Sequence, residues 1–158
     1  LAALAGVLDR FPQESRAATT ERCAWGLLLA GEGKQAAELF SSAMTPGTRT
    51  VSLLRGLGES CLAAGDDAQA FAAFRDISAG LKPEGDGARD YFHAWVRMLE
   101  VLSRQNADGS KRDSIAREVR RLRLLNPAQA CPDCAARLDA VERGVESPAG
   151  GPDKTGPG

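Results

Sequence analysis

The sequence has few of the residues that build catalytic and metal sites. Its 158 residues include one histidine, His93, together with one tyrosine and two tryptophans. A single histidine excludes a three-histidine metal centre built within this chain. Asp90, Tyr91 and Arg97 stand near His93, but neither a nucleophile nor a second base can be assigned to it, so we interpret it as a surface or groove residue. We therefore expect neither enzyme activity nor a cofactor.

Long hydrophobic runs and an excess of one charge sign are also missing. The longest uncharged apolar stretch, residues 24–30, is far shorter than the roughly 20 residues that a membrane-spanning helix needs. The net charge of −1 provides no global field that would gather nucleic acid or an anionic membrane. Leu1 is not an initiator methionine, and no basic segment precedes the apolar residues 1–8 as a signal peptide requires. We expect a trimmed chain whose compartment the sequence leaves open, with the cytoplasm favoured.

Apolar and small residues are abundant instead. Hydrophobic residues make up 43% of the chain and charged residues 26%, which is typical of about one globular domain with a buried core. There are 27 alanines, and the 16 arginines outnumber the 4 lysines. This bias is typical of proteins translated from GC-rich bacterial genomes.

An internal repeat with a period of 34 residues organises the chain. Gly31, Ala36 and Phe40 recur as Gly65, Ala70 and Phe74. A period of this length with helical spacing inside each unit is typical of a helical solenoid, in which each unit buries its apolar face on its neighbour.

The spacing inside each unit predicts a pair of helices. In the second unit, Gly65 ends the first helix and either Asp66 or Asp67 starts the next. The small Ala36 and Ala70 allow the paired helices to approach closely, and the two phenylalanines fill the space one turn further on. The apolar faces of the four helices carry Trp25 and Leu27 to Leu29, then Ala36, Leu39, Phe40 and Ala43, then Leu53, Leu54, Leu57 and Cys61, then Ala70, Phe71, Phe74 and Ile77.

These residues resemble the tetratricopeptide repeat family, whose unit reads Trp-x2-Leu-Gly-x2-Tyr, then Ala-x3-Phe, then Pro. The second unit matches it with Leu54-x2-Leu57-Gly58-x2-Cys61, Ala70-x3-Phe74 and Pro83. A third unit reads Trp95-x2-Met98-Leu99-x2-Leu102, then Ile115-x3-Val119 and Asn126-Pro127, with about one extra helical turn between its two parts. The resemblance implies an all-α superhelix of three to four antiparallel helix pairs.

The predicted boundaries follow from these units. Pro132 suits the first turn of a capping helix with the apolar stripe Ala135, Leu138 and Val141. Five glycines and three prolines in the last 15 residues predict a disordered tail. The repeat domain spans 1–143, with a partial unit at 1–14, units at 17–47, 51–83 and 88–127, a capping helix at 132–143, and the tail at 144–158.

In this family the first helix of each unit lines a concave groove, so the resemblance implies a non-catalytic scaffold that binds a protein segment there. The mixture of side chains on these faces suits a peptide with apolar anchors, and Trp25 is the leading anchor. No asparagine stands among them, although family members that clamp the terminal carboxylate of chaperone tails use asparagines, so we reject that type of partner. The implied groove residues are Glu21, Trp25, Leu28, Ser52, Arg55, Glu59, Leu62, His93, Arg97 and Glu100.

Cys131-Pro132-Asp133-Cys134 is the one motif with redox or metal character. A helix amino terminus lowers a thiol pKa, and two thiolates three residues apart can hold one metal ion. The other cysteines, Cys23 and Cys61, fall on the apolar faces of two separate helices, where they act as small core residues. The pair therefore has three interpretations: two structural thiols, a disulfide or a metal site. A thiol-redox or metal-responsive module is the alternative function.

Basic residues gather in a third region, at Lys111, Arg112, Arg117, Arg120, Arg121 and Arg123. Because Ile115, Val119 and Leu122 take the inward stripe of a helix, Arg117, Arg120 and Arg121 point outward. We interpret this as a solvated face, with docking to acidic protein or nucleic acid as the alternative. No interleaved aromatics support base stacking. Self-association is a further alternative, because a chain that begins inside a repeat leaves an open solenoid edge and would serve as a subunit-contact arm.

Overall fold

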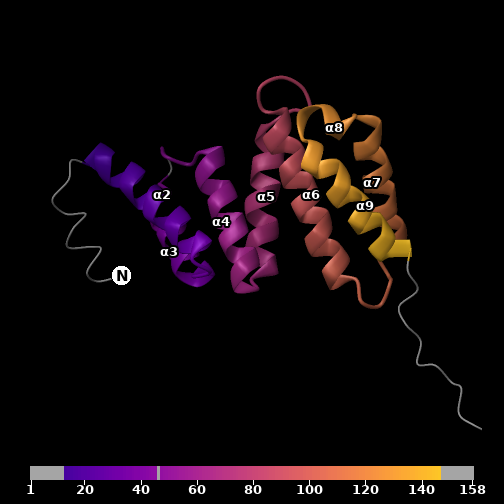
Figure 1. Ribbon diagram of the computed structural model, residues 1–158, viewed down its shortest axis with the longest axis horizontal. Helices are drawn as coiled ribbons and strands as arrows, with labels where there is room; N and C mark the ends of the chain where they lie inside the picture. Colours follow the sequence, from indigo (N-terminus) through magenta and orange to yellow (C-terminus); the bar gives the residue numbers. More distant parts are fainter. Residues whose placement is uncertain (1–12, 46, 147–158) are drawn as a thin grey trace, which may run out of the picture. The chain divides into compact units, whose positions relative to one another are not determined.

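The computed structural model describes residues 13–45 and 47–146, and the described residues form α-helices and turns without a strand. This confirms the all-α prediction (Figure 1). The first 12 residues of the predicted partial unit, and the predicted tail from residue 147 onward, lie outside the described residues. The helices are α2 (Gln13–Leu29), α3 (Gly33–Ala43), α4 (Val51–Ala64), α5 (Asp67–Gly80), α6 (Ala88–Gln105), α7 (Arg112–Leu124), α8 (Pro127–Ala130) and α9 (Pro132–Glu146).

The contacts of the chain divide into two compact units, of which the first ends at Gly80 and the second begins at Leu81. The repeat pattern predicted one domain over 1–143. The first unit holds α2 to α5 and the second holds α6 to α9. None of the described helices combines the length and the apolar character needed to cross a bilayer.

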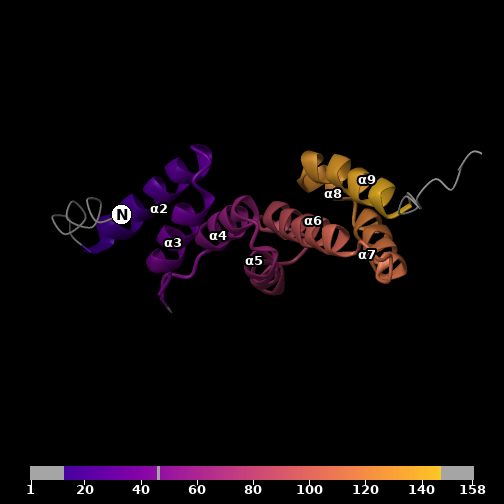
Figure 2. The same ribbon diagram turned by 90° about the horizontal axis from the view of Figure 1, so that it is seen from below.

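In the first unit each helix packs against the next one along the chain. α2 packs against α3, α3 against α4 and α4 against α5, and α2 also contacts α4 (Figure 1, Figure 2). The two helix pairs, α2 with α3 and α4 with α5, correspond to the predicted units at 17–47 and 51–83. Helix α2 begins four residues before the predicted start of its unit, at Gln13.

The turns after α2 and α4 repeat the same backbone hydrogen bonds. Gly31 and Gly65 have positive φ values of 84° and 80°, a conformation that suits glycine. The amide of Gly65 donates to the carbonyl of Leu62 at 3.2 Å, and Gly31 donates to Leu28 at 3.1 Å. The Asp66 carboxylate accepts from the amide of Gln69 at 2.9 Å and so caps α5. The predicted helix end at Gly65 is confirmed.

Two phenylalanines pack directly against glycines in the core of this unit. Phe40 of α3 and Phe74 of α5 are completely buried, as are Ala36 and Ala70, which confirms their predicted places. The Phe40 ring lies against Gly56 and the Phe74 ring against Gly58, both within α4. A Cβ atom added to Gly58 would lie 2.6 Å from Cζ of Phe74. The two glycines therefore allow aromatic rings from both neighbouring helices to reach the backbone of α4.

The second unit is organised around α9. This helix contacts α6, α7 and α8, and α6 also contacts α7 and α8. The four extra residues predicted between Trp95 and Ile115 lie in the loop 106–111 between α6 and α7, which has six residues where the turn between α4 and α5 has two, so they do not form a helical turn. Helix α9 begins at Pro132 as expected and ends at Glu146, three residues beyond the predicted end of the capping helix. The core of the unit contains Tyr91, Phe92, Val96, Leu99, Ile115, Val119, Leu122, Cys131, Cys134, Leu138, Val141 and Val145.

Candidate functional site

The predicted groove residues of the first unit form one row on α2 and another on α4. The members of each row lie on one face of their helix, because they recur at intervals of three or four residues. All seven are half-buried, so each has some surface open to solvent. We call this set the α2–α4 strip; it consists of Glu21, Trp25 and Leu28 on α2, and Ser52, Arg55, Glu59 and Leu62 on α4.

Two contacts join the halves of the α2–α4 strip. The Ser52 hydroxyl donates a hydrogen bond to the Glu21 carboxylate. The Arg55 guanidinium lies over the Trp25 ring, 5.8 Å from the ring centroid, which is within the range of a cation–π interaction. The structure therefore brings together two pairs of residues that are about 30 positions apart in the sequence.

Trp25 is anchored from the core as well. Its ring packs edge-on against Phe40 of α3, with 5.2 Å between the ring centroids and an angle of 77° between the planes. Because Phe40 is fully buried, this contact holds the indole in place. Trp25 thus combines a fixed position with a partly exposed surface, which is the combination expected of a binding anchor.

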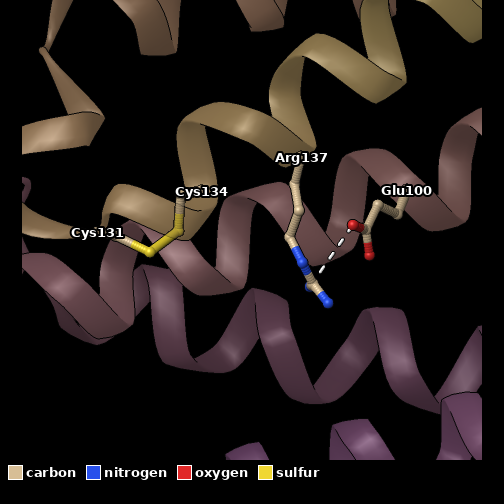
Figure 3. The surroundings of a disulfide bond; sticks show 4 residues. All are labelled: Glu100, Cys131, Cys134 and Arg137. Carbon is tan, nitrogen blue, oxygen red and sulfur yellow. Dashed lines mark ion pairs between the residues drawn. A yellow bond between two sulfur atoms is a disulfide. The ribbon is translucent and has the colours of Figure 1, made fainter.

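The remaining predicted groove residues, His93, Arg97 and Glu100, lie on one face of α6 in the second unit. Nη1 of Arg97 donates to Oε2 of Glu100 at 2.7 Å. Oε1 of Glu100 lies 3.5 Å from Nη1 of Arg137 on α9 (Figure 3). The Glu100 carboxylate is therefore shared by two guanidinium groups. The role of Arg137 was not predicted, because an ion pair between helices so far apart in the sequence leaves no local pattern.

Cys131 and Cys134 form a disulfide, with their Cα atoms 5.3 Å apart (Figure 3). Of the three interpretations of this motif, the disulfide is the one found in the structure. Both residues belong to the core of the second unit, with 5% and 1% of their surface exposed. Bonded sulfurs are not thiolates, so this pair cannot coordinate a metal ion while the bond is intact. Nor do the described residues gather three or more cysteine, histidine or acidic side chains into a possible metal site.

A hollow of about 480 Å³ in the first unit was not predicted. Cys61 lies in its lining, and its thiol donates to Oε1 of Gln69 at 3.1 Å. Burial, and secondly the charge of Asp66, raise the pKa of the Cys61 thiol to about 11, so the thiol is protonated and a weak nucleophile at neutral pH. With 1% of its surface exposed, Cys61 is buried as predicted, whereas Cys23 is only half-buried. The lining consists of Lys34, Ala37, Glu38, Ser41, Cys61, Ala64, Asp66 and Gln69.

The arginines of α7 point outward as predicted. Ile115, Val119 and Leu122 are buried, and Arg117, Arg120 and Arg121 are exposed. Arg121 lies over the Trp95 ring, 4.6 Å from its centroid, and its Nε donates to Glu118 at 2.6 Å. The hydrogen bond that Arg121 donates to the Glu118 carboxylate is the main cause that raises the pKa of Arg121. Arg123 pairs with Asp139 and Glu142 of α9, at 2.6 Å and 2.5 Å.

The chain was compared with protein-family models, with curated proteins and with solved structures, and none of them matches it.

Proposed function

We propose that this chain is a tetratricopeptide-like helical repeat protein that binds a segment of a partner protein on the α2–α4 strip, without chemistry of its own. The proposal rests on two contacts between α2 and α4. Ser52 donates a hydrogen bond to Glu21, and Arg55 lies over the ring of Trp25. These contacts make one continuous, partly exposed surface from residues that the repeat pattern selects. The 34-residue period and the sequential packing of α2 to α5 support the repeat assignment.

The chemistry of the strip favours an extended peptide with at least one apolar side chain. Trp25, Leu28 and Leu62 offer apolar contacts, and Trp25 is held in place before any ligand binds. Glu21 and Glu59 offer carboxylates, and Arg55 offers a guanidinium, so the strip has polar groups of both signs for peptide side chains and backbone amides. We also keep the prediction that His93, Arg97 and Glu100 on α6 contact the partner segment.

The experiment selects binders from phage that display random 12-residue peptides, using the full chain as bait. Selected peptides are then synthesised and titrated by calorimetry against the wild-type chain and against Arg55→Glu and Leu28→Glu. Arg22→Glu is the matched control, because Arg22 is an exposed residue of α2 that lies outside the strip. Circular dichroism verifies that each variant is folded.

The proposal expects selected peptides that contain an apolar residue and bind at least tenfold more weakly to Arg55→Glu and Leu28→Glu, with less than a threefold change for Arg22→Glu. A library that yields no enriched peptide would overturn it. Peptides that bind the strip variants as tightly as the wild-type chain would overturn it as well.

The disulfide favours a second candidate function, a thiol switch in the second unit. A thiolate of a dithiol reductant would attack one sulfur, the bond between Cys131 and Cys134 would break, and the two cysteines would take up two protons as the reductant becomes a disulfide. Because both sulfurs are in the core, attack requires the unit to open locally, so we propose a slow response that is coupled to the stability of α9.

A further inference from the structure

One face of α7 is exposed and carries both arginine and leucine. Arg117, Arg120 and Leu124 recur at intervals of three and four residues, on the side of the helix opposite the buried Ile115, Val119 and Leu122. Leu124 is 87% exposed. Leu125, which follows it, is 39% exposed. We call Arg117, Arg120 and Leu124 the α7 strip.

The two arginines of the α7 strip differ from their neighbours in their electrostatic surroundings. Arg121 pairs with Glu118, and Arg123 pairs with two carboxylates of α9. Among the described residues, no carboxylate forms an ion pair with Arg117 or Arg120; Nε of Arg120 donates to the backbone carbonyl of Ala116 in the same helix. The strip therefore has two guanidinium groups that form no ion pair with a carboxylate of the described residues, next to an exposed apolar side chain.

We propose that the α7 strip binds an acidic protein segment that also carries a large aliphatic residue. A guanidinium pairs with a carboxylate through two parallel hydrogen bonds, and Arg117 and Arg120 present two such groups about one helical turn apart. Leu124 lies about one turn further on, where an aliphatic side chain of the partner would cover it. The matching partner has two carboxylates and an aliphatic residue within about 10 Å.

Two observations favour an acidic protein over nucleic acid. Helix α7 contains no aromatic residue on which a base could stack. The exposed Leu124 gives no favourable contact to a phosphate backbone, whereas a protein segment can cover it with an aliphatic side chain. This inference goes beyond the proposed function, because it concerns another helix and uses none of the ten predicted groove residues.

The test measures fluorescence anisotropy of a labelled 12-residue peptide that repeats Glu-Glu-Leu four times. A peptide that repeats Glu-Glu-Ser has the same charge without leucine, and a 12-nucleotide DNA, single-stranded or duplex, represents nucleic acid. The variants of the full chain are Arg117→Glu with Arg120→Glu, and Leu124→Ser. The matched control is Arg89→Glu with Arg143→Glu, which reverses two exposed charges elsewhere in the second unit.

The expected result is binding of the Glu-Glu-Leu peptide that weakens at least tenfold in the double arginine variant and at least threefold in Leu124→Ser. The control variant and Arg55→Glu should change it by less than threefold, and the affinity should fall as salt rises. No binding, equal binding to the strip variants, or equal affinity for the Glu-Glu-Ser peptide would overturn the inference. Tighter binding of DNA than of the peptide would overturn it in favour of nucleic acid.

Discussion

At the scale of the residue, Gly58 is explained by the ring that lies against it. Replacing Gly58 by alanine puts a Cβ atom 2.6 Å from Cζ of Phe74, whose ring is completely buried, so the ring or the helix must shift. Overpacking of this kind costs about 1 to 3 kcal/mol, against a gain of about 1 kcal/mol from the better helix propensity of alanine. We expect Gly58→Ala to lower the free energy of unfolding by up to about 2 kcal/mol, measured by urea unfolding followed by circular dichroism.

Gly26→Ala is the matched control for this prediction. Gly26 is also inside a helix, α2, but a Cβ atom added there meets no atom within 4 Å. Alanine should therefore raise the free energy of unfolding by about 0.5 to 1 kcal/mol through helix propensity alone. If both variants were equally stabilised, the contact between Gly58 and Phe74 would not be as close as described.

Cys61 gives a prediction that depends on pH. Because burial raises its pKa to about 11, on the order of one thiol in a thousand is ionised at pH 8. In a Cys23→Ser variant, where Cys61 is the one cysteine outside the disulfide, we expect iodoacetamide to label the folded chain at least 100-fold more slowly than the urea-unfolded chain. The rate should increase with pH up to about 11. Equal rates in both states would contradict the burial of this thiol.

The sequence predicted much of the packing of single residues, but not all of it. Phe40, Phe74, Ala36 and Ala70 were identified from the period alone, because a repeated apolar residue at helical spacing belongs to the core. The packing role of Gly58 was not identified as such. The sequence around a glycine inside a helix does not show whether the backbone there faces solvent or contacts an aromatic ring. That depends on how closely the neighbouring helix packs.

At the scale of the element, the disulfide joins the end of α8 to the first turn of α9. Closing such a four-residue loop stabilises a fold by about 2 kcal/mol in the chain-entropy account. We expect reduction to lower the free energy of unfolding of the second unit by about that amount. Because both sulfurs are buried, dithiothreitol should reduce the folded chain slowly, and low urea concentrations should accelerate the reaction.

The measurement is the rate of thiol release with and without 1 to 2 M urea, followed by thermal unfolding of the reduced chain. A variant with both Cys131 and Cys134 replaced by alanine is the control, and its unfolding should not respond to the reductant. Rapid, complete reduction of the folded chain without urea would show that the sulfurs are accessible, contrary to their burial.

Helix boundaries were predicted best where the helix ends at a glycine or begins at a proline. Gly65 ends α4 and Pro132 begins α9, and both were identified because glycine adopts positive φ and proline suits a first turn. The end of α9 was placed three residues too early, at 143, because the glycine- and proline-rich composition from Gly144 onward predicted a disordered tail. The burial of Val145 in the core of the second unit extends the helix past that glycine, and this burial depends on tertiary packing.

At the scale of the whole molecule, local sequence patterns predict the helix pairs, but they do not predict that the contacts between helices divide the chain into two compact units. The sequence indicated one repeat domain, and the ten predicted groove residues came from a single pattern. In the structure seven of them lie in the first unit and three in the second. The contacts between Glu21 and Ser52, and between Trp25 and Arg55, follow from the repeat, because equivalent faces of successive units are neighbours. The ion pair of Glu100 with Arg137 does not follow from the repeat.

The division into two compact units leads to a last prediction, on hydrogen exchange. Amide exchange reports local opening, so a perturbation that loosens one unit should accelerate exchange mainly in the helices of that unit. Gly58→Ala destabilises the packing of α4 against α5 in the first unit. Reduction of the disulfide between Cys131 and Cys134 destabilises the α8–α9 junction in the second unit. We expect faster exchange in α2 to α5 for the first and in α6 to α9 for the second, measured by mass spectrometry of peptic fragments. Acceleration spread evenly over both units in either case would show that the chain opens as one cooperative body, and would contradict the division at Gly80.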